Sequence, residues 1–143
     1  MNDITLTPPT EEQLRSGELG LKLRHYNYGF VGEYPKQEYI RLDARDANGR
    51  LLGGLRGFVF LYWLNIEVLF VEEDARGAGL GSRLLAEAER QAIALGATNA
   101  KLDTFEWQAP GFYLKHGYEE FARIDDYAPG FYLALMKKPL QAS

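Results

Sequence analysis

A glycine-rich run near the middle of the chain has the composition of an anion-binding loop. Residues 76–81 read Arg-Gly-Ala-Gly-Leu-Gly, so three glycines fall within five positions and let the backbone approach a ligand closely. Apolar, partly β-branched residues precede the run at 66–71, and residues with helical spacing follow it at 82–90. The loop should therefore join a strand to a helix, whose free N–H groups and positive dipole end favour phosphate.

Two common phosphate-binding loops do not fit this run. A P-loop ends in Gly-Lys-Ser/Thr, whereas Gly81 is followed by Ser82 and Arg83. A dinucleotide-binding fingerprint places G-x-G-x-x-G in the first βαβ unit, but here the last position counted from Gly77 is Ser82, and the run lies mid-chain. The remaining pattern, R-x-x-G-x-G, resembles the coenzyme A pyrophosphate loop of the GNAT superfamily of N-acetyltransferases. A glycine-rich turn without a ligand is the alternative interpretation.

A second stretch, residues 109–118, carries the same resemblance. In GNAT enzymes an aromatic residue and a tyrosine on a short helix precede a glycine-aromatic pair that opens the next strand. Here Phe112 and Tyr113 precede Gly117, which ends the helix, and Tyr118, which starts the strand. The two motifs occur in the family's order, and the resemblance extends from about Arg41 to Lys138.

The resemblance implies where acetyl-CoA is bound. The strand before the loop would splay away from the next parallel strand, and the coenzyme would occupy the gap, with a backbone N–H near Leu69 polarising the thioester carbonyl. Many members have an asparagine seven residues before the tyrosine, but Glu106 stands there, which leaves Gln108 or Thr104 as a replacement. The implied coenzyme contacts are Leu69, Phe70, Val71, Arg76, Gly77, Ala78, Gly79, Leu80, Gly81, Ser82, Gln108 and Tyr113.

Three residues are candidates for moving protons during acetyl transfer. Tyr113 matches the tyrosine that protonates the leaving thiolate in many members, since a phenol with a pKa near 10 is protonated at neutral pH; the alternative is a packing role. Glu67, which alternation places opposite Ile66, Val68 and Phe70, is the candidate general base, directly or through water. It could equally be an exposed acid on the open sheet face. Asp103 is the rival base, or it anchors the loop that follows it.

Periodicity and turn residues predict the elements that position these groups. The helix after the loop should bury Leu80, Leu84, Ala88, Ala92 and Leu95 and stop at Gly96. The strand that follows it should run parallel to the strand before the loop. The other expected elements are a strand at 2–7, one broken or two short helices at 11–30, strands at 40–45, 51–61 and 64–71 with a turn at 46–49, a strand at 100–105, a helix at 108–115, and strands at 118–124 and 131–137 joined through 125–130.

These elements predict an α/β fold of the α+β kind. The GNAT resemblance implies a mixed, mostly antiparallel sheet flanked by helices, with a splayed parallel strand pair at the cofactor site. The chain of 143 residues is expected to form a single domain, 1–143. Glycines in the strand at 51–61 suggest a bulge or a close neighbour.

Composition narrows the class of function. The net charge is −4 and the sequence pI about 5.2, with no basic face, which disfavours nucleic-acid binding. Cysteine is absent, and His25 and His116 lack metal-ligand spacing, so we expect no metal site and no thiol nucleophile. No signal peptide or membrane-length apolar run is evident, so a cytoplasmic location without membrane contact is expected.

The resemblance implies transfer of an acetyl group from acetyl-CoA to a primary amine by direct attack in a ternary complex. The acceptor would be a small molecule or a peptide, and a homodimer would be usual for the superfamily. Trp63, Phe105, Trp107 and Tyr127 either line an aromatic acceptor pocket or serve as ordinary core and rim residues. Two other functions stay open, namely a coenzyme A-binding regulatory protein without catalysis and an acyltransferase for longer chains.

Overall fold

The computed structural model describes residues 3–141, and the chain divides into two compact units, Met1–Tyr34 and Pro35–Ser143. The first unit contains helices α1 (Glu11–Ser16) and α2 (Glu18–Val31). A capping box starts α1, because the Thr10 hydroxyl accepts from the Gln13 N–H and the Gln13 side chain accepts from the Thr10 N–H. Gly17, at φ +67°, separates the helices, so of the two predicted alternatives the structure has two helices and not one broken helix.

The strand predicted at 2–7 is wrong for residues 3–7, which are not in a strand; Asn2 lies outside the described residues. An isolated extended segment needs a neighbouring strand to satisfy its backbone groups. Within the described part of the first unit only helices are formed, so no such neighbour exists there.

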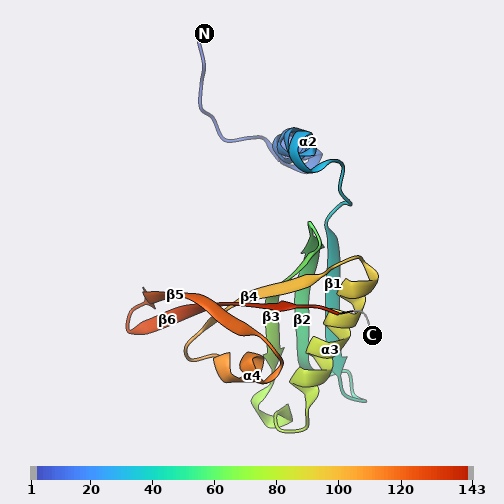
Figure 1. Cartoon of the computed structure of the whole chain (residues 1–143), viewed down its shortest axis with the longest axis vertical. Helices are drawn as coiled ribbons and strands as arrows, with labels where there is room; N and C mark the ends of the chain where they lie inside the picture. Colours follow the sequence, from blue (N-terminus) through green and yellow to red (C-terminus); the bar gives the residue numbers. More distant parts are fainter. Residues whose placement is uncertain (1–2, 142–143) are drawn as a thin grey trace. The chain divides into compact units, whose positions relative to one another are not determined.

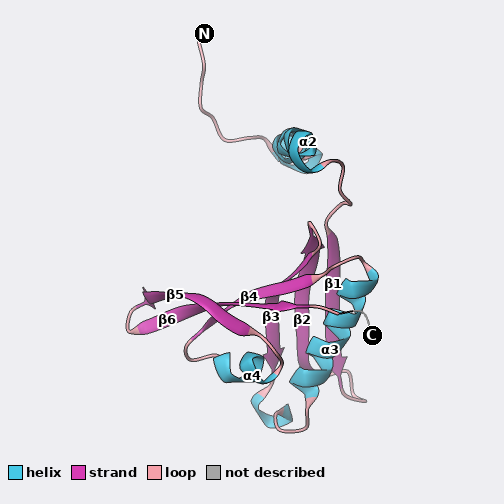
Figure 2. Ribbon diagram, viewed as in Figure 1, coloured by secondary structure: helices cyan, strands magenta, loops and turns pink. Residues whose placement is uncertain are grey.

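The second unit is built on a six-stranded sheet of order β1-β2-β3-β4-β6-β5 (Figures 1 and 2). Every neighbouring pair is antiparallel except β3 and β4, which are parallel. This sheet confirms the predicted fold class. The strands are β1 (Glu38–Arg45), β2 (Leu51–Phe60), β3 (Trp63–Val71), β4 (Asn99–Phe105), β5 (Glu119–Ala128) and β6 (Phe131–Pro139).

Helix α3 (Leu80–Ala94) packs against β1, β2 and β3 and supplies much of the core. Its buried residues are Leu84, Leu85, Ala88 and Ala92, while the predicted core residue Leu95 is 40% exposed. The helix ends before Leu95, so the Leu95 side chain does not lie on the buried face of α3. Gly96, at φ +95°, ends the helix as predicted. A short helix, α4 (Pro110–Lys115), follows β4. No helix within residues 3–141 is long and apolar enough to cross a membrane.

A bulge in β3 changes which side chains face the core. Gly57 pairs with Ile66 and Arg56 with Val68, so Glu67 has no partner on β2. Before the bulge Ile66 is buried, whereas after it Leu69 packs on the core and Val68 and Phe70 are each 51% exposed. The prediction that Val68 and Phe70 share a face with Ile66 is therefore wrong, because the extra residue shifts the alternation by one.

The parallel pairing of β3 and β4 stops where the bulge begins. Its last pair is Ile66 with Leu102, and residues 67–71 and 103–105 have no partner in that ladder. Gly53 of β2 lies so close to the diverging strand that an added Cβ would be 2.6 Å from the Phe70 carbonyl oxygen. The predicted splayed pair is present, and of the two alternatives for the strand at 51–61 the close neighbour is found, at Gly53; the extra residue of the bulge lies in β3, opposite that strand.

The connection between β5 and β6 is shorter than predicted. Strand β5 continues to Ala128, and the turn comprises Pro129 and Gly130 rather than residues 125–130. The strand tolerates Asp126 at φ +57° because its register with β6 shifts between Ile124 and Ala128. The Asp126 carboxylate accepts the Gly130 N–H at 2.8 Å, which stabilises the turn.

Candidate active site

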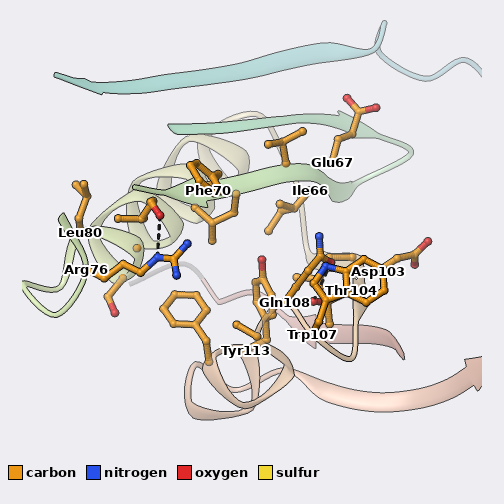
Figure 3. A pocket seen from close by; sticks show the side chains of 18 of the residues that line it. Ile66, Glu67, Phe70, Arg76, Leu80, Asp103, Thr104, Trp107, Gln108 and Tyr113 are labelled. Atoms are coloured by element: carbon orange, nitrogen blue, oxygen red, sulfur yellow. Dashed lines mark hydrogen bonds between the residues drawn. The ribbon is translucent and has the colours of Figure 1, made fainter. Parts of the chain in front are cut away.

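A cavity of about 800 Å³ opens where β3 and β4 diverge (Figure 3). Its walls come from β3, the loop and first turn of α3, the end of β4, and α4. The structure thus brings together segments that are far apart in the sequence. Of the predicted site residues, Ala78 alone does not line the cavity; those that do are Glu67, Leu69, Phe70, Val71, Arg76, Gly77, Gly79, Leu80, Gly81, Ser82, Asp103, Gln108 and Tyr113.

One end of the cavity has the features of a phosphate site. Gly77 and Gly79 adopt φ +90° and φ +79°, and a Cβ on either would meet nothing within 4 Å, so the surface above the loop is open. No side chain caps α3 at Gly79, which leaves the first-turn N–H groups available to an anion. The Arg76 Nε donates to the Val71 carbonyl at 2.9 Å, which fixes the guanidinium near the same loop. These residues fit the pyrophosphate of a coenzyme.

A histidine directly after α4 holds the first turn of α3. The His116 Nε2 and the Ser82 Oγ are 2.7 Å apart, and the imidazole lies 4.5 Å from the Phe112 ring. The His116 Nδ1 is buried and has no hydrogen-bond partner among the described residues. This link joins residues 34 positions apart, so no local pattern could have predicted it.

Tyr113 lies on α4 against the floor of the cavity and is only 8% exposed. Its ring makes edge contacts with Phe112 and Tyr118 at centroid distances of 5.2 and 5.8 Å. Burial raises the pKa of Tyr113 to about 12, because the charged phenolate would be poorly solvated there. The phenol therefore keeps its proton at neutral pH, and it donates to no other described residue.

Gln108 is fixed by its oxygen and leaves its nitrogen available. The Gln108 Oε1 accepts the Phe105 N–H at 2.7 Å and lies 3.4 Å from the hydroxyl of buried Thr104. Its amide nitrogen donates to no described residue, so it is a free donor on the cavity wall. Glu106 occupies the position at which many GNAT members have an asparagine. It accepts the Tyr132 N–H at 3.3 Å and is not among the described residues that line the main cavity or the second, smaller cavity.

Two carboxylates stand at the point where the parallel strands separate. Glu67 and Asp103 line the main cavity and also a second one of about 350 Å³, to which Lys101 contributes. Neither carboxylate forms a hydrogen bond or an ion pair with another residue in 3–141. Figure 3 shows Glu67 on the side of β3 away from Gln108, and Asp103 pointing away from the centre of the cavity. Both therefore lie on the boundary between the two cavities.

The profile of the family described as "Acetyltransferase (GNAT) domain" matches residues 38–120, more than half of the chain. The chain belongs to the GNAT acetyltransferases. It is thus an N-acetyltransferase, and the family implies that acetyl-CoA is its acyl donor. Within the residues that the structure describes, no group of three or more His, Asp or Glu residues could hold a metal ion.

Known relatives of this GNAT acetyltransferase agree with that assignment. A blasticidin-S acetyltransferase from Streptomyces morookaense is 47% identical over 98 residues, which cover 68% of this chain and 72% of the relative. The crystal structure of an acetyltransferase from Bacillus cereus ATCC 14579 is 31% identical, with a TM-score of 0.82 over 96% of this chain and 98% of that one. An aminoglycoside 6'-N-acetyltransferase complexed with coenzyme A shares the fold at 18% identity, with a TM-score of 0.65 over 74% of this chain and 75% of that one.

Aromatic side chains cluster around Trp107, which Figure 3 shows in the acetyltransferase cavity away from Arg76. Phe105 and Trp107 stack at 4.4 Å with their planes 8° apart, and Tyr127 contacts Phe105 at 5.5 Å. Phe131, which the sequence did not indicate, meets Trp107 edge-on at 5.0 Å. Trp107 lines the cavity. Trp63 is not part of this cluster, since it starts β3 beside Asn99 and lines neither cavity.

Proposed function

We propose that this chain transfers the acetyl group of acetyl-CoA to a primary amine by direct attack within a ternary complex. The observation that carries the proposal is one cavity that joins an anion site, a protonated phenol and two unpaired carboxylates. When bound, acetyl-CoA supplies a thioester carbonyl as the electrophile and a thiolate as the leaving group.

Binding groups lie along the diverging part of β3. The first-turn N–H groups of α3 and the Arg76 side chain would bind the pyrophosphate. The backbone of 69–71, which β4 leaves unpaired, would bind the pantetheine arm, and an N–H near Leu69 would polarise the thioester carbonyl. Gln108 would add its free amide nitrogen.

Proton movement can be assigned to the groups at the strand boundary. The amine loses a proton to Glu67 or Asp103, directly or through water, as the N–C bond forms and the C–S bond breaks. The Tyr113 hydroxyl donates to the departing sulfur. With a phenol pKa of about 12 and an ordinary thiol pKa near 8.5, complete transfer in isolation costs on the order of 5 kcal/mol. Tyr113 therefore acts chiefly as a hydrogen-bond donor until the thiolate, desolvated in the same cavity, gains proton affinity.

A covalent acyl-enzyme is not part of this proposal. The chain has no cysteine, and the Ser82–His116 pair lacks the carboxylate that orients a catalytic histidine, since the His116 Nδ1 has no partner among the described residues. Ser82 also lies at the phosphate end, in the first turn of α3. The pair is better suited to hold the loop than to attack a thioester.

The acceptor is proposed to be a small molecule, because the relative from Streptomyces morookaense is a blasticidin-S acetyltransferase; a peptide amine is the second class to test. A homodimer and a single domain spanning 1–143 are further proposals. Light scattering of the protein as it elutes from a size-exclusion column tests whether it is a homodimer.

Calorimetric titration with acetyl-CoA, with NAD as a control, is the first test. Micromolar affinity, roughly −8 kcal/mol, is expected for acetyl-CoA and none for NAD. Mass spectrometry of an amine panel that includes blasticidin S should then show acetylated product. Binding of acetyl-CoA without any acetylated product would favour the alternative that the chain is a coenzyme A-binding regulatory protein without catalysis. Faster transfer from acyl-CoA with a longer acyl chain would favour an acyltransferase for longer chains. Absence of binding would contradict the site.

A further inference from the structure

The exposure of Trp107 is the least explained feature of the cavity. Phe105 covers one face of its indole ring in a near-parallel stack, yet Trp107 remains 54% exposed. Tyr127 and Phe131, 57% and 43% exposed, stand beside the stack. A cluster of solvent-exposed aromatic rings at a cavity is typical of a ligand-binding surface. The stack fixes the indole plane before any ligand arrives, so little side-chain entropy would be lost on binding.

The charges around the cavity differ between its two ends. Among the residues that line the main cavity, Arg76 is the basic one, and it lies at the glycine loop with its Nε bound to Val71. The acidic residues are Glu67 and Asp103, both unpaired within 3–141. Figure 3 shows Trp107 beside Thr104 and Asp103, away from Arg76. An ammonium group would therefore be attracted to the aromatic end and a phosphate to the loop end.

We infer that the acceptor is an amine attached to a planar aromatic or heteroaromatic ring. The ring stacks on the exposed face of Trp107, and the amine reaches the boundary where Glu67 and Asp103 stand. This inference rests on the proposed acetyl transfer but adds the substrate class. An aliphatic polyamine offers the carboxylates a charge but gives Trp107 no flat surface to contact.

Fluorescence of Trp107 tests the binding site without requiring turnover. The chain has two tryptophans, so Trp63→Phe, which changes a residue outside both cavities, leaves Trp107 as the single reporter. The probes are 2-phenylethylamine and 2-cyclohexylethylamine, which carry the same amine on a flat and a puckered ring. We expect saturable quenching by the flat amine, with a Kd at least about fivefold lower than for the puckered one. Equal Kd values, or no response to either amine, would overturn the inference.

Steady-state kinetics separates this inference from the proposed function. Trp107→Ala should raise KM for 2-phenylethylamine at least about tenfold, leave KM for acetyl-CoA unchanged, and alter KM for 2-cyclohexylethylamine little. Trp107→Phe, which keeps a flat ring, should recover most of the loss. Quenching without acetylation would support the ring site and contradict transfer to the bound amine. Acetylation of both amines with equal kcat/KM would support acetyl transfer and overturn the ring site.

Discussion

A buried phenol and two exposed carboxylates line the same cavity. Desolvation holds the proton on Tyr113, while Glu67 and Asp103 remain close to water. A buried phenol that keeps its proton can donate it, while a solvated carboxylate can accept one. The roles of the three side chains can be tested one at a time.

Tyr113→Phe should lower kcat on the order of 10²-fold and leave the Kd for acetyl-CoA unchanged, because only the donated hydrogen bond is removed. Stopped assays for kcat and calorimetry for Kd check this. Tyr39→Phe is the matched control, since Tyr39 lies on β1, is exposed and lines neither cavity. A kcat equal to that of the unaltered enzyme would reduce Tyr113 to a packing residue.

The alkaline limb of the rate profile should lie above the range of an ordinary phenol. Because burial raises the pKa of Tyr113 to about 12, its donor form persists through pH 10, where a free phenol is half ionised. We expect kcat to show no decline between pH 8 and about 10.5. A half-maximal fall near pH 10 that is absent from Tyr113→Phe would contradict the burial argument.

Glu67→Gln should lower kcat mainly on the acidic side of the pH–rate profile, where the amine arrives protonated, because the amide cannot accept the amine proton. Asp103→Asn is the paired variant and is expected to leave the profile unchanged. Both residues line the same two cavities, so the pair controls for local charge. If the loss appears only in Asp103→Asn, the base is Asp103; if neither variant shows it, water serves instead.

Strand β3 is the element on which the site depends. Its bulge at Glu67 ends the pairing with β4, turns Val68 and Phe70 out of the core, and leads into the glycine loop. Helix α3 then presents its first turn to the opened space, and His116, directly after α4, fixes Ser82 within that turn. The cavity therefore results from interrupted pairing.

Gly79→Asp should weaken acetyl-CoA binding by at least about 100-fold, because a carboxylate at the start of α3 repels the pyrophosphate. Gly79→Asn is the matched control, since asparagine has the same shape and tolerates the left-handed conformation at φ +79°. We expect its Kd to stay within about tenfold of the parent value by calorimetry. Equal losses in both variants would assign the effect to shape or backbone strain.

Sequence patterns predicted the features that depend on neighbouring residues. The turn at 46–49, the stop at Gly96 and the loop at 76–81 each need only a few adjacent positions. The phase change at Glu67 depends on pairing with β2, and the Ser82–His116 and Trp107–Phe131 contacts join distant segments. Single-sequence reasoning has no access to such contacts, which is why Phe131 and the role of His116 were not predicted.

The whole chain places its core in one of its two compact units. Every member of the main hydrophobic cluster, from Ile40 to Leu140, lies after residue 34. Helices α1 and α2 bury none of their own residues. The free energy of unfolding of the sheet should therefore arise chiefly from residues 35–143.

Removal of residues 1–34 should leave a fragment that unfolds cooperatively, because its core residues are all retained. Thermal unfolding followed by circular dichroism measures this, with the full chain as the control. Loss of the cooperative transition would show that the core residues after position 34 are not sufficient for folding.

The two ends of the cavity are encoded by separate stretches of the chain. The glycine run at 76–81 and the first turn of α3 form the anion end, whereas the aromatic cluster comes from residues 105–131, on β4, the loop after it and the β5–β6 hairpin. Several of the aromatic side chains are exposed, so they can be exchanged without opening a hole in the core. During divergence, such an enzyme can acquire a new target through a handful of surface replacements while its acyl-donor machinery is inherited intact.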